Sequence, residues 1–322
     1  MTTRLALAAL VVGCAMAQPV PVIFDTDMGN DVDDALALAM LHSLESRGEC
    51  RLAAVTITKD NPWAAVYVDL VNAFYGRGRI PVGMVRGGVT PEDAALIQRP
   101  SERKRADGTF VYARRLASGG EAPEAVGLLR RVLAAEKDGS VVIVQVGFST
   151  NLARLLDAPD DVALVKRKVK LLSVMAGNFA QQKPEFNVEK DTASARKLFA
   201  RWPTAIVASG FEVGEKLLFP AARIERDFAW AADHPVVDAY RAYKPMPYDR
   251  QTWDLTSVLY AVRPGGDYFG LSAPGRIRSD DAGRTQFAAD AAGAHRYLVL
   301  SEAQRARTLE TMVLLASEPV SR

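Results

Sequence analysis

The first two thirds of the chain alternate between short apolar runs and longer segments with a helical period. The apolar runs predict buried strands and lie at residues 20–24, 51–58, 80–85, 141–146, 169–175 and 204–208. The helix-like segments lie at residues 35–40, 62–75, 123–135, 151–156 and 192–201. Repeated strand–helix units favour a parallel sheet covered by helices. We therefore expect an α/β fold: a single-domain, Rossmann-like, open and mostly parallel sheet flanked by helices.

Two regions depart from this alternation. Residues 91–120 carry many charges and several glycines, and we expect a long surface excursion there. After residue 219 the pattern is less regular. It predicts helices at residues 233–243, 253–262 and 301–316, a short strand at 268–271 and an exposed turn at 280–283. No internal repeat or low-complexity linker interrupts the sequence, so we expect one domain over residues 18–322.

Composition narrows the class of protein. The chain has 322 residues, of which 49% are hydrophobic and 24% charged, which suits a globular protein with a sizeable core. Its formal net charge of +2 is near balance and gives no signal for a nucleic-acid partner. A small-molecule ligand is the expected partner, and the oligomeric state stays open, with a homo-oligomer as one option.

The amino terminus predicts a targeting segment. Residues 1–17 combine a short positive start, an apolar stretch and a small-residue cleavage site, which is typical of a secretory signal peptide. The segment is too short to span a bilayer as a helix. We expect a secreted or periplasmic protein. The alternative is a lipid-anchored envelope protein, because the residues around Cys14 resemble a bacterial lipoprotein box.

The sequence places five aspartates within ten residues, at 25–34, directly after the first predicted strand. Open α/β sheets bind ligands at the carboxyl ends of their strands. Carboxylates this close repel each other and raise one another's pKa values, and a bound hard cation removes that repulsion. Carboxylates, carbonyls and water are the ligands that Ca²⁺ prefers. The loop therefore predicts a metal site.

Four further polar segments accompany the acidic loop. Most of them follow predicted strands, so they are expected at the same edge of the sheet. They lie at residues 59–61, at 147–151, at 175–178 together with 184–187, and at 253–254. Their carboxylates, amides and hydroxyls suit a hard metal ion and a polyhydroxylated ligand.

Taken together, these segments resemble the inosine–uridine-type nucleoside hydrolases. The resemblance begins with Asp25-Thr26-Asp27 and the paired Asp33-Asp34, and it continues in the same order along the chain. Its later elements are Asn61, the Gly-x-x-Thr-Asn of residues 147–151, the Glu-Phe-Asn of residues 185–187, and Asp254. It covers residues 20–271. Each motif alone is weakly specific, but five in this order are strongly specific.

The resemblance implies a nucleoside hydrolase fold and a calcium-dependent N-ribohydrolase, which cleaves a nucleoside into base and ribose. It implies that Ca²⁺ is held by Asp27, Asp34, Asp254 and the backbone carbonyl of Thr150. Asp27 would also be the general base that deprotonates the attacking water. The residues implied to bind the ribosyl group are Asp33, Asn61, Met175, Asn178, Glu185 and Asn187.

Two features depart from the family's pattern. Five residues separate Asp27 from Asp33, where the family usually has three, and this leaves Asp31 without an assigned role. Trp253 stands where many members have a histidine that protonates the leaving base. Members with tryptophan there resemble the purine-preferring branch, so Trp253 is predicted to assist catalysis by stacking on a purine. Phe211 and Tyr248 are candidate pocket walls.

Two rival functions remain at this point. A haloacid-dehalogenase-like phosphatase also places Asp-x-Asp after its first strand, and it would use Asp25 as the nucleophile. A non-catalytic envelope protein that binds nucleosides or ribosyl compounds is the other, and it is favoured by the longer loop and by Trp253. Phosphate release would identify the first, and calcium-dependent binding without ribose release would identify the second.

Overall fold

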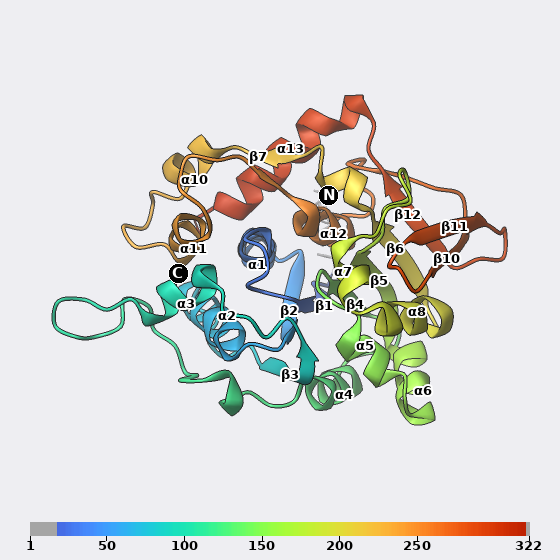
Figure 1. The fold of residues 1–322 in the computed structure, drawn as a ribbon, viewed down its shortest axis with the longest axis horizontal. Helices are drawn as coiled ribbons and strands as arrows, with labels where there is room; N and C mark the ends of the chain where they lie inside the picture. Colours follow the sequence, from blue (N-terminus) through green and yellow to red (C-terminus); the bar gives the residue numbers. More distant parts are fainter. Residues whose placement is uncertain (1–17, 320–322) are drawn as a thin grey trace, which may run out of the picture.

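An open sheet forms the centre of the molecule, as Figure 1 shows for this computed structural model, which describes residues 18–319. Its parallel part contains β1 (Val20–Thr26), β2 (Cys50–Lys59), β3 (Val82–Val89), β4 (Val141–Gln145), β5 (Val169–Met175), β6 (Ala205–Ser209) and β12 (His295–Val299). The predicted α/β fold with a mostly parallel open sheet is confirmed. The predicted signal peptide and the alternative anchor at Cys14 lie outside the described residues.

The order of the parallel strands reverses at β1. The sheet runs β12-β6-β5-β4-β1-β2-β3, so β1 pairs with β2 on one side and with β4 on the other. The connections therefore diverge from the carboxyl ends of β1 and β4. Such a topological switch point opens a crevice at the sheet edge, which is the usual ligand site of doubly wound folds.

Antiparallel strands extend the sheet beyond β12. They are β9 (Gly270–Leu271), β10 (Gly275–Ser279) and β11 (Thr285–Ala289). Residues 280–283 form the turn between β10 and β11, at the predicted position. A separate pair joins β7 (Leu218–Phe219) to β8 (Arg250–Gln251).

Helices cover both faces of the sheet (Figure 1). One face carries α1 (Asp33–Ser46), α2 (Pro62–Phe74), α3 (Ala95–Glu102), α10 (Ala221–Asp227), α11 (Pro235–Tyr243), α12 (Trp253–Val262) and α13 (Glu302–Ser317). The other carries α4 (Ala125–Ala135), α5 (Thr150–Leu155), α6 (Pro159–Lys168), α7 (Phe186–Lys190) and α8 (Thr192–Arg201). Two short elements, η1 (Gly119–Glu121) and α9 (Phe211–Gly214), lie in the connections.

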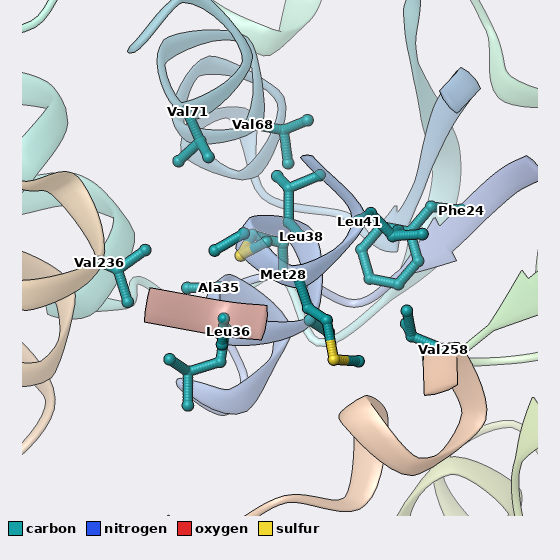
Figure 2. Packing of buried hydrophobic residues seen from close by; sticks show 14 of the residues in the cluster. Phe24, Met28, Ala35, Leu36, Leu38, Leu41, Val68, Val71, Val236 and Val258 are labelled. Carbon is teal, nitrogen blue, oxygen red and sulfur yellow. The ribbon is translucent and has the colours of Figure 1, made fainter. Parts of the chain in front are cut away.

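The apolar runs are continuous because the sheet is buried on both faces. In β1, Phe24 packs in the core around α1, whereas its neighbour Ile23 packs in the core beneath α4 and α5. Figure 2 shows the first core, where Leu38 of α1 lies among side chains from α2, α11 and α12. This packing fixes the amino-terminal end of α1 over the switch point. No helix of residues 18–319 is long and apolar enough to cross a membrane.

Candidate active site

A pocket of about 320 Å³ opens at the switch point. Its floor is polar and buried, and consists of Asp27, Asp33, Asp34, Asp254, Glu185 and Asn187 with Met175 and Val146. Its rim is more exposed and largely aromatic, and consists of Phe186, Phe211, Tyr243 and Trp253 with Asn30, Asp31 and Arg250. The floor therefore suits a polar group and the rim suits a flat apolar one.

Three carboxylates meet on the floor, from the first turns of two helices. Asp33 and Asp34 begin α1, and Asp254 lies in the first turn of α12. One oxygen from each lies within 4.8 Å of the others, and all three side chains are buried. An oxygen of Asp33 accepts the backbone N–H of Asp254 over 3.1 Å, which ties the two helix ends together. Helix amino termini favour carboxylates because their N–H groups carry partial positive charge.

A bound cation would stabilise the ionised form of these three carboxylates. Burial raises the pKa values of Asp33, Asp34 and Asp254 well above the usual range, and repulsion from neighbouring carboxylates raises them further. Buried carboxylates at this density can ionise together only when a positive charge accompanies them. The oxygen-only donor set fits a hard divalent ion such as Ca²⁺. The carboxylate group of Asp33, Asp34 and Asp254 can therefore hold a metal ion. The family resemblance implies that Asp33 binds the sugar, whereas the structure places Asp33 within this group of carboxylates.

Asp27 lies beside the carboxylate group and has its own supports. Its Oδ2 atom accepts a hydrogen bond of 2.7 Å from the Asn30 amide, and the Asn30 carbonyl accepts one of 2.9 Å from the Lys59 ammonium. Burial raises the pKa of Asp27 to about 6, against the opposing effect of the Asn30 hydrogen bond. This raised pKa brings proton exchange on Asp27 closer to neutral pH than is usual for an aspartate.

Glu185 and Asn187 also lie on the pocket floor. The Glu185 carboxylate caps α7 and accepts N–H groups of Asn187 and Val188 (2.9 and 3.3 Å), and also of Gly177 (3.0 Å). Burial nevertheless raises the pKa of Glu185 to about 7. The Asn187 amide donates to the carbonyls of Val146 and Met175 over 2.8 and 3.1 Å. These bonds hold both side chains rigidly at the pocket, as hydroxyl recognition requires.

Trp253 lies on the rim, and its indole N–H already makes a hydrogen bond within the protein. Its indole N–H donates to the carbonyl of Phe211 over 3.0 Å, and the two rings stack with centroids 5.4 Å apart. The guanidinium carbon of Arg250 lies 5.2 Å from the Trp253 ring centroid. Trp253 therefore offers the pocket an apolar surface rather than a hydrogen-bond donor.

Three predicted site residues are absent from the pocket lining within residues 18–319. The Asn61 side chain caps α2 and donates to the carbonyl of Pro91 over 3.1 Å. The Asn178 carbonyl accepts the N–H of Gln181 over 2.9 Å. Thr150 begins α5, and its hydroxyl donates to Asp191 over 2.5 Å. Tyr248 is also absent from the lining and stacks on Tyr240, with centroids 5.4 Å apart.

Asp25 is fully buried and does not line the pocket. It accepts hydrogen bonds from Asn151 over 2.9 Å and from Thr56. Burial raises its pKa to about 7. A phosphatase nucleophile must reach its substrate, so this placement argues against the phosphatase alternative.

Sequence reasoning missed several residues at the site. Asn30 and Lys59 form the chain of hydrogen bonds that ends on Asp27, and Arg250 and Tyr243 form part of the rim. The signal for them was proximity to the predicted motifs: Asn30 lies inside the acidic loop, Lys59 begins the polar segment at 59–61, and Arg250 precedes Trp253 by three positions.

A second, larger cavity of about 800 Å³ lies between α8 and β10. Its charged lining residues are basic, and include Arg201 and Arg278. It contains no carboxylate that could hold a cation or accept a proton, so it does not compete as the catalytic pocket.

The fold and the pocket define a doubly wound α/β protein with a buried group of three carboxylates that could hold a metal ion. The comparison with protein families gives the narrower assignment. The chain belongs to the inosine-uridine preferring nucleoside hydrolase family, which matches residues 22–312. The family predicted from the motifs is confirmed.

Solved structures support the fold over nearly the whole chain. An inosine-uridine preferring nucleoside hydrolase from Bacillus anthracis is 17% identical, with a TM-score of 0.71, over 93% of this chain and 100% of that one. A purine-preferring ribonucleoside hydrolase from Gardnerella vaginalis is 20% identical, with a TM-score of 0.69, over 92% and 98%. The type III effector protein XopQ, solved in complex with adenosine diphosphate ribose, is 16% identical, with a TM-score of 0.65, over 94% and 95%. No curated protein matches the chain.

Proposed function

We propose that this protein is a calcium-dependent N-ribohydrolase that cleaves the N-glycosidic bond of a purine nucleoside into base and ribose. The observation that carries the proposal is the carboxylate group of Asp33, Asp34 and Asp254 beside Asp27 in one pocket. Membership of the nucleoside hydrolase family supports the reaction class.

The floor residues divide the work of the reaction. Asp33, Asp34 and Asp254 would hold the ion. When bound, Ca²⁺ would lower the pKa of water and attract the sugar hydroxyls. Asp27 takes a proton from the attacking water: its Oδ2 is held by Asn30, so Oδ1 is the oxygen left for this proton. Glu185 and Asn187 bind the sugar hydroxyls and fix the ring for attack at its anomeric carbon.

The chemical step is a displacement at the anomeric carbon. A bond forms from the water oxygen to that carbon, and the bond from the carbon to the base nitrogen breaks. The water proton goes to Asp27, and the electron pair of the broken bond goes to the base. Positive charge develops on the sugar ring in the transition state, which the buried carboxylates stabilise.

The aromatic rim supports a purine as the leaving base. Phe211 and Trp253 line the rim as a stacked pair, and Phe186, which is 44% exposed, lines the same pocket. Stacking on aromatic side chains contributes about 1–3 kcal/mol per base and grows with ring area, which favours a bicyclic base.

A non-catalytic ribosyl-binding protein is the alternative. The similarity to the effector XopQ, solved with adenosine diphosphate ribose, favours this reading. The intact set of Asp27 with three metal-suited carboxylates favours an enzyme.

We further propose that the protein is secreted or exported, on the composition of residues 1–17.

A reducing-sugar assay over a panel of purine and pyrimidine nucleosides tests the proposal. The expected result is ribose release that is fastest with purines and that stops in a chelator. Calcium-dependent binding of nucleosides without ribose release would establish the alternative instead.

A further inference from the structure

Asp31 lies on the pocket rim and is bound to Arg250. The Arg250 Nε–H donates to one oxygen of Asp31 over 2.8 Å, and a terminal N–H of the same guanidinium donates to the other oxygen. Both side chains are mostly buried. A two-pronged bond between a guanidinium and a carboxylate fixes the plane of the guanidinium as well as its position. The longer acidic loop thus places Asp31 at the rim, where the Asp31 carboxylate orients the Arg250 guanidinium.

Aromatic rings also hold Arg250 over the rim. Its guanidinium carbon lies 5.2 Å from the ring centroid of Trp253 and 5.3 Å from that of Tyr243. A guanidinium over an aromatic face is attracted by the negative face of the ring. Arg250 also belongs to β8, which pairs with β7, so its backbone is fixed.

Arg250 keeps hydrogen-bond donors free for a ligand. A guanidinium has five N–H groups. Two of these bond to Asp31, and one bonds to the Gln251 side chain over 3.2 Å. The remaining N–H groups, on the two terminal nitrogens, have no acceptor among residues 18–319.

Among residues 18–319, no tryptophan, histidine or tyrosine side chain near the rim is suited to protonate a departing base. The Trp253 N–H is bonded to the Phe211 carbonyl. The chain's three histidines, His42, His234 and His295, do not line the pocket. Burial, followed by nearby Asp31, raises the pKa of Tyr243 to about 12, so its hydroxyl gives up a proton reluctantly.

We propose that Arg250 stabilises the departing base, with Asp31 as its positioning residue. This inference rests on the proposed function, with the sugar on the polar floor and the base at the rim. When the bond between the anomeric carbon and the base nitrogen breaks, the electron pair leaves the base negatively charged. The free N–H groups of Arg250 donate to an acceptor on the base and offset this charge. Arg250 keeps its own protons, and the departing base takes its proton from solvent water.

Two substrates with different leaving groups test this role. The hypoxanthine base of inosine is a poor leaving group, whereas 4-nitrophenyl riboside releases 4-nitrophenolate, which is stable as an anion without help. We expect Arg250→Met to lower kcat on inosine by about 100-fold or more, which is the usual loss for one charge-stabilising donor. On 4-nitrophenyl riboside the same variant should stay within about 3-fold of wild type, since this reaction has no need of that donor.

Further variants separate a catalytic role from a structural one. Asp31→Asn should lower kcat on inosine by about 10-fold with little change on the nitrophenyl substrate, because it loosens Arg250 without removing it. Arg226→Met, at an exposed site on α10, is the matched control and should leave both rates unchanged. Melting temperatures report whether each variant folds, and Arg250→Lys serves as the conservative replacement, with partial activity on inosine.

The outcomes distinguish this inference from the proposed function. Equal losses on both substrates, or no loss on inosine, would overturn the role of Arg250 and leave the hydrolase intact. A wild-type protein that hydrolyses neither substrate would overturn both. The pH profile gives a second readout: because Arg250 donates no proton, kcat on inosine should stay flat between pH 7 and pH 9. A basic limb in that range would show an acid that titrates there and would contradict the inference.

Discussion

The carboxylate of Asp33 accepts a hydrogen bond of 3.1 Å from the backbone N–H of Asp254, across 221 positions of sequence. This bond joins the first turn of α1 to the first turn of α12. The two helices also pack against each other along their lengths. The carboxylate group is therefore preorganised by the core around α1, and its charge density is a fixed property of the fold.

Removal of one of these carboxylates should weaken calcium binding. Asp254→Asn keeps the size of the side chain but deletes a charge, and we expect calcium affinity to fall by about 100-fold or more. Isothermal titration with Ca²⁺ measures the affinity. Asp281→Asn is the control, because the Asp281 side chain is 85% exposed and does not line the pocket. Equal affinity in Asp254→Asn and wild type would remove Asp254 from the metal site.

The stabilisation by calcium should grow with pH. The pKa of Asp27 is raised to about 6 from 3.8, and burial also raises the pKa values of Asp33, Asp34 and Asp254 well above their usual range. In the ion-free protein, the stability that these carboxyl groups contribute is fully present below about pH 4. It is lost as the pH rises through the pKa values that the groups have in the folded protein. Calcium binds the deprotonated group, so its effect increases over the same range.

The measurement is the difference in melting temperature between Ca²⁺ and chelator from pH 5 to pH 8. We expect this difference to rise with pH. Burial lowers the pKa values of His42 and His234 to about 3, which acts in the opposite direction on absolute stability. Both histidines lie away from the pocket, so their effect cancels in the difference. A difference that is constant or falls with pH would contradict the prediction.

Asn30 should set the pH at which the general base becomes active. Its amide bond to Asp27 lowers the pKa of that carboxyl, so Asn30→Ala should raise it. Since Asp27 must be ionised to accept a proton, the acidic limb of kcat/KM should move to higher pH in the variant. The expected loss is about 10-fold at pH 6 and smaller at pH 8. An unchanged acidic limb would show that Asn30 does not act on the base.

Asn61 should matter for stability rather than for substrate binding. Its side chain caps α2 and reaches the carbonyls of Pro91 and Glu92. Loss of a helix cap costs about 1 kcal/mol, so Asn61→Ala should lower the free energy of unfolding by about that amount. Its KM should stay within about 2-fold of wild type, while Asn187→Ala should raise KM by about 10-fold. A large rise in KM in Asn61→Ala would restore it as a sugar-binding residue.

The sequence predicted the six parallel strands β1 to β6, because these strands are largely buried and read as continuous apolar runs. The bounds of α8 and α12 agree with the predicted residues 192–201 and 253–262. The strands β10, β11 and β12 were missed, since they lie at or near the edge of the sheet and are only partly buried. The helix α6 was missed because its first turn and its last turn are charged.

Site residues were predictable from the sequence only where they belong to short local motifs. Asp27, Asp34, Asp254, Glu185 and Asn187 were predicted, and the structure places all of them on the pocket floor. Their motifs lie at the ends of strands or the starts of helices, which topology alone brings together. The contact between Asp31 and Arg250 spans 219 positions and depends on side-chain reach, which no local pattern encodes. Asn61 and Asn178 fit the motifs equally well, but their side chains have nearer partners. The role of the Thr150 backbone carbonyl as a metal ligand stays a prediction.

The central claim is that the carboxylates around the switch point hold a calcium ion that the reaction needs. The most direct measurement is ribose release from inosine by one preparation of the wild-type protein, first in Ca²⁺, then in excess chelator, then with Ca²⁺ restored. We predict turnover in the first and third conditions and its loss in the second. Turnover that persists in chelator, in protein shown by elemental analysis to be free of metal, would contradict the account.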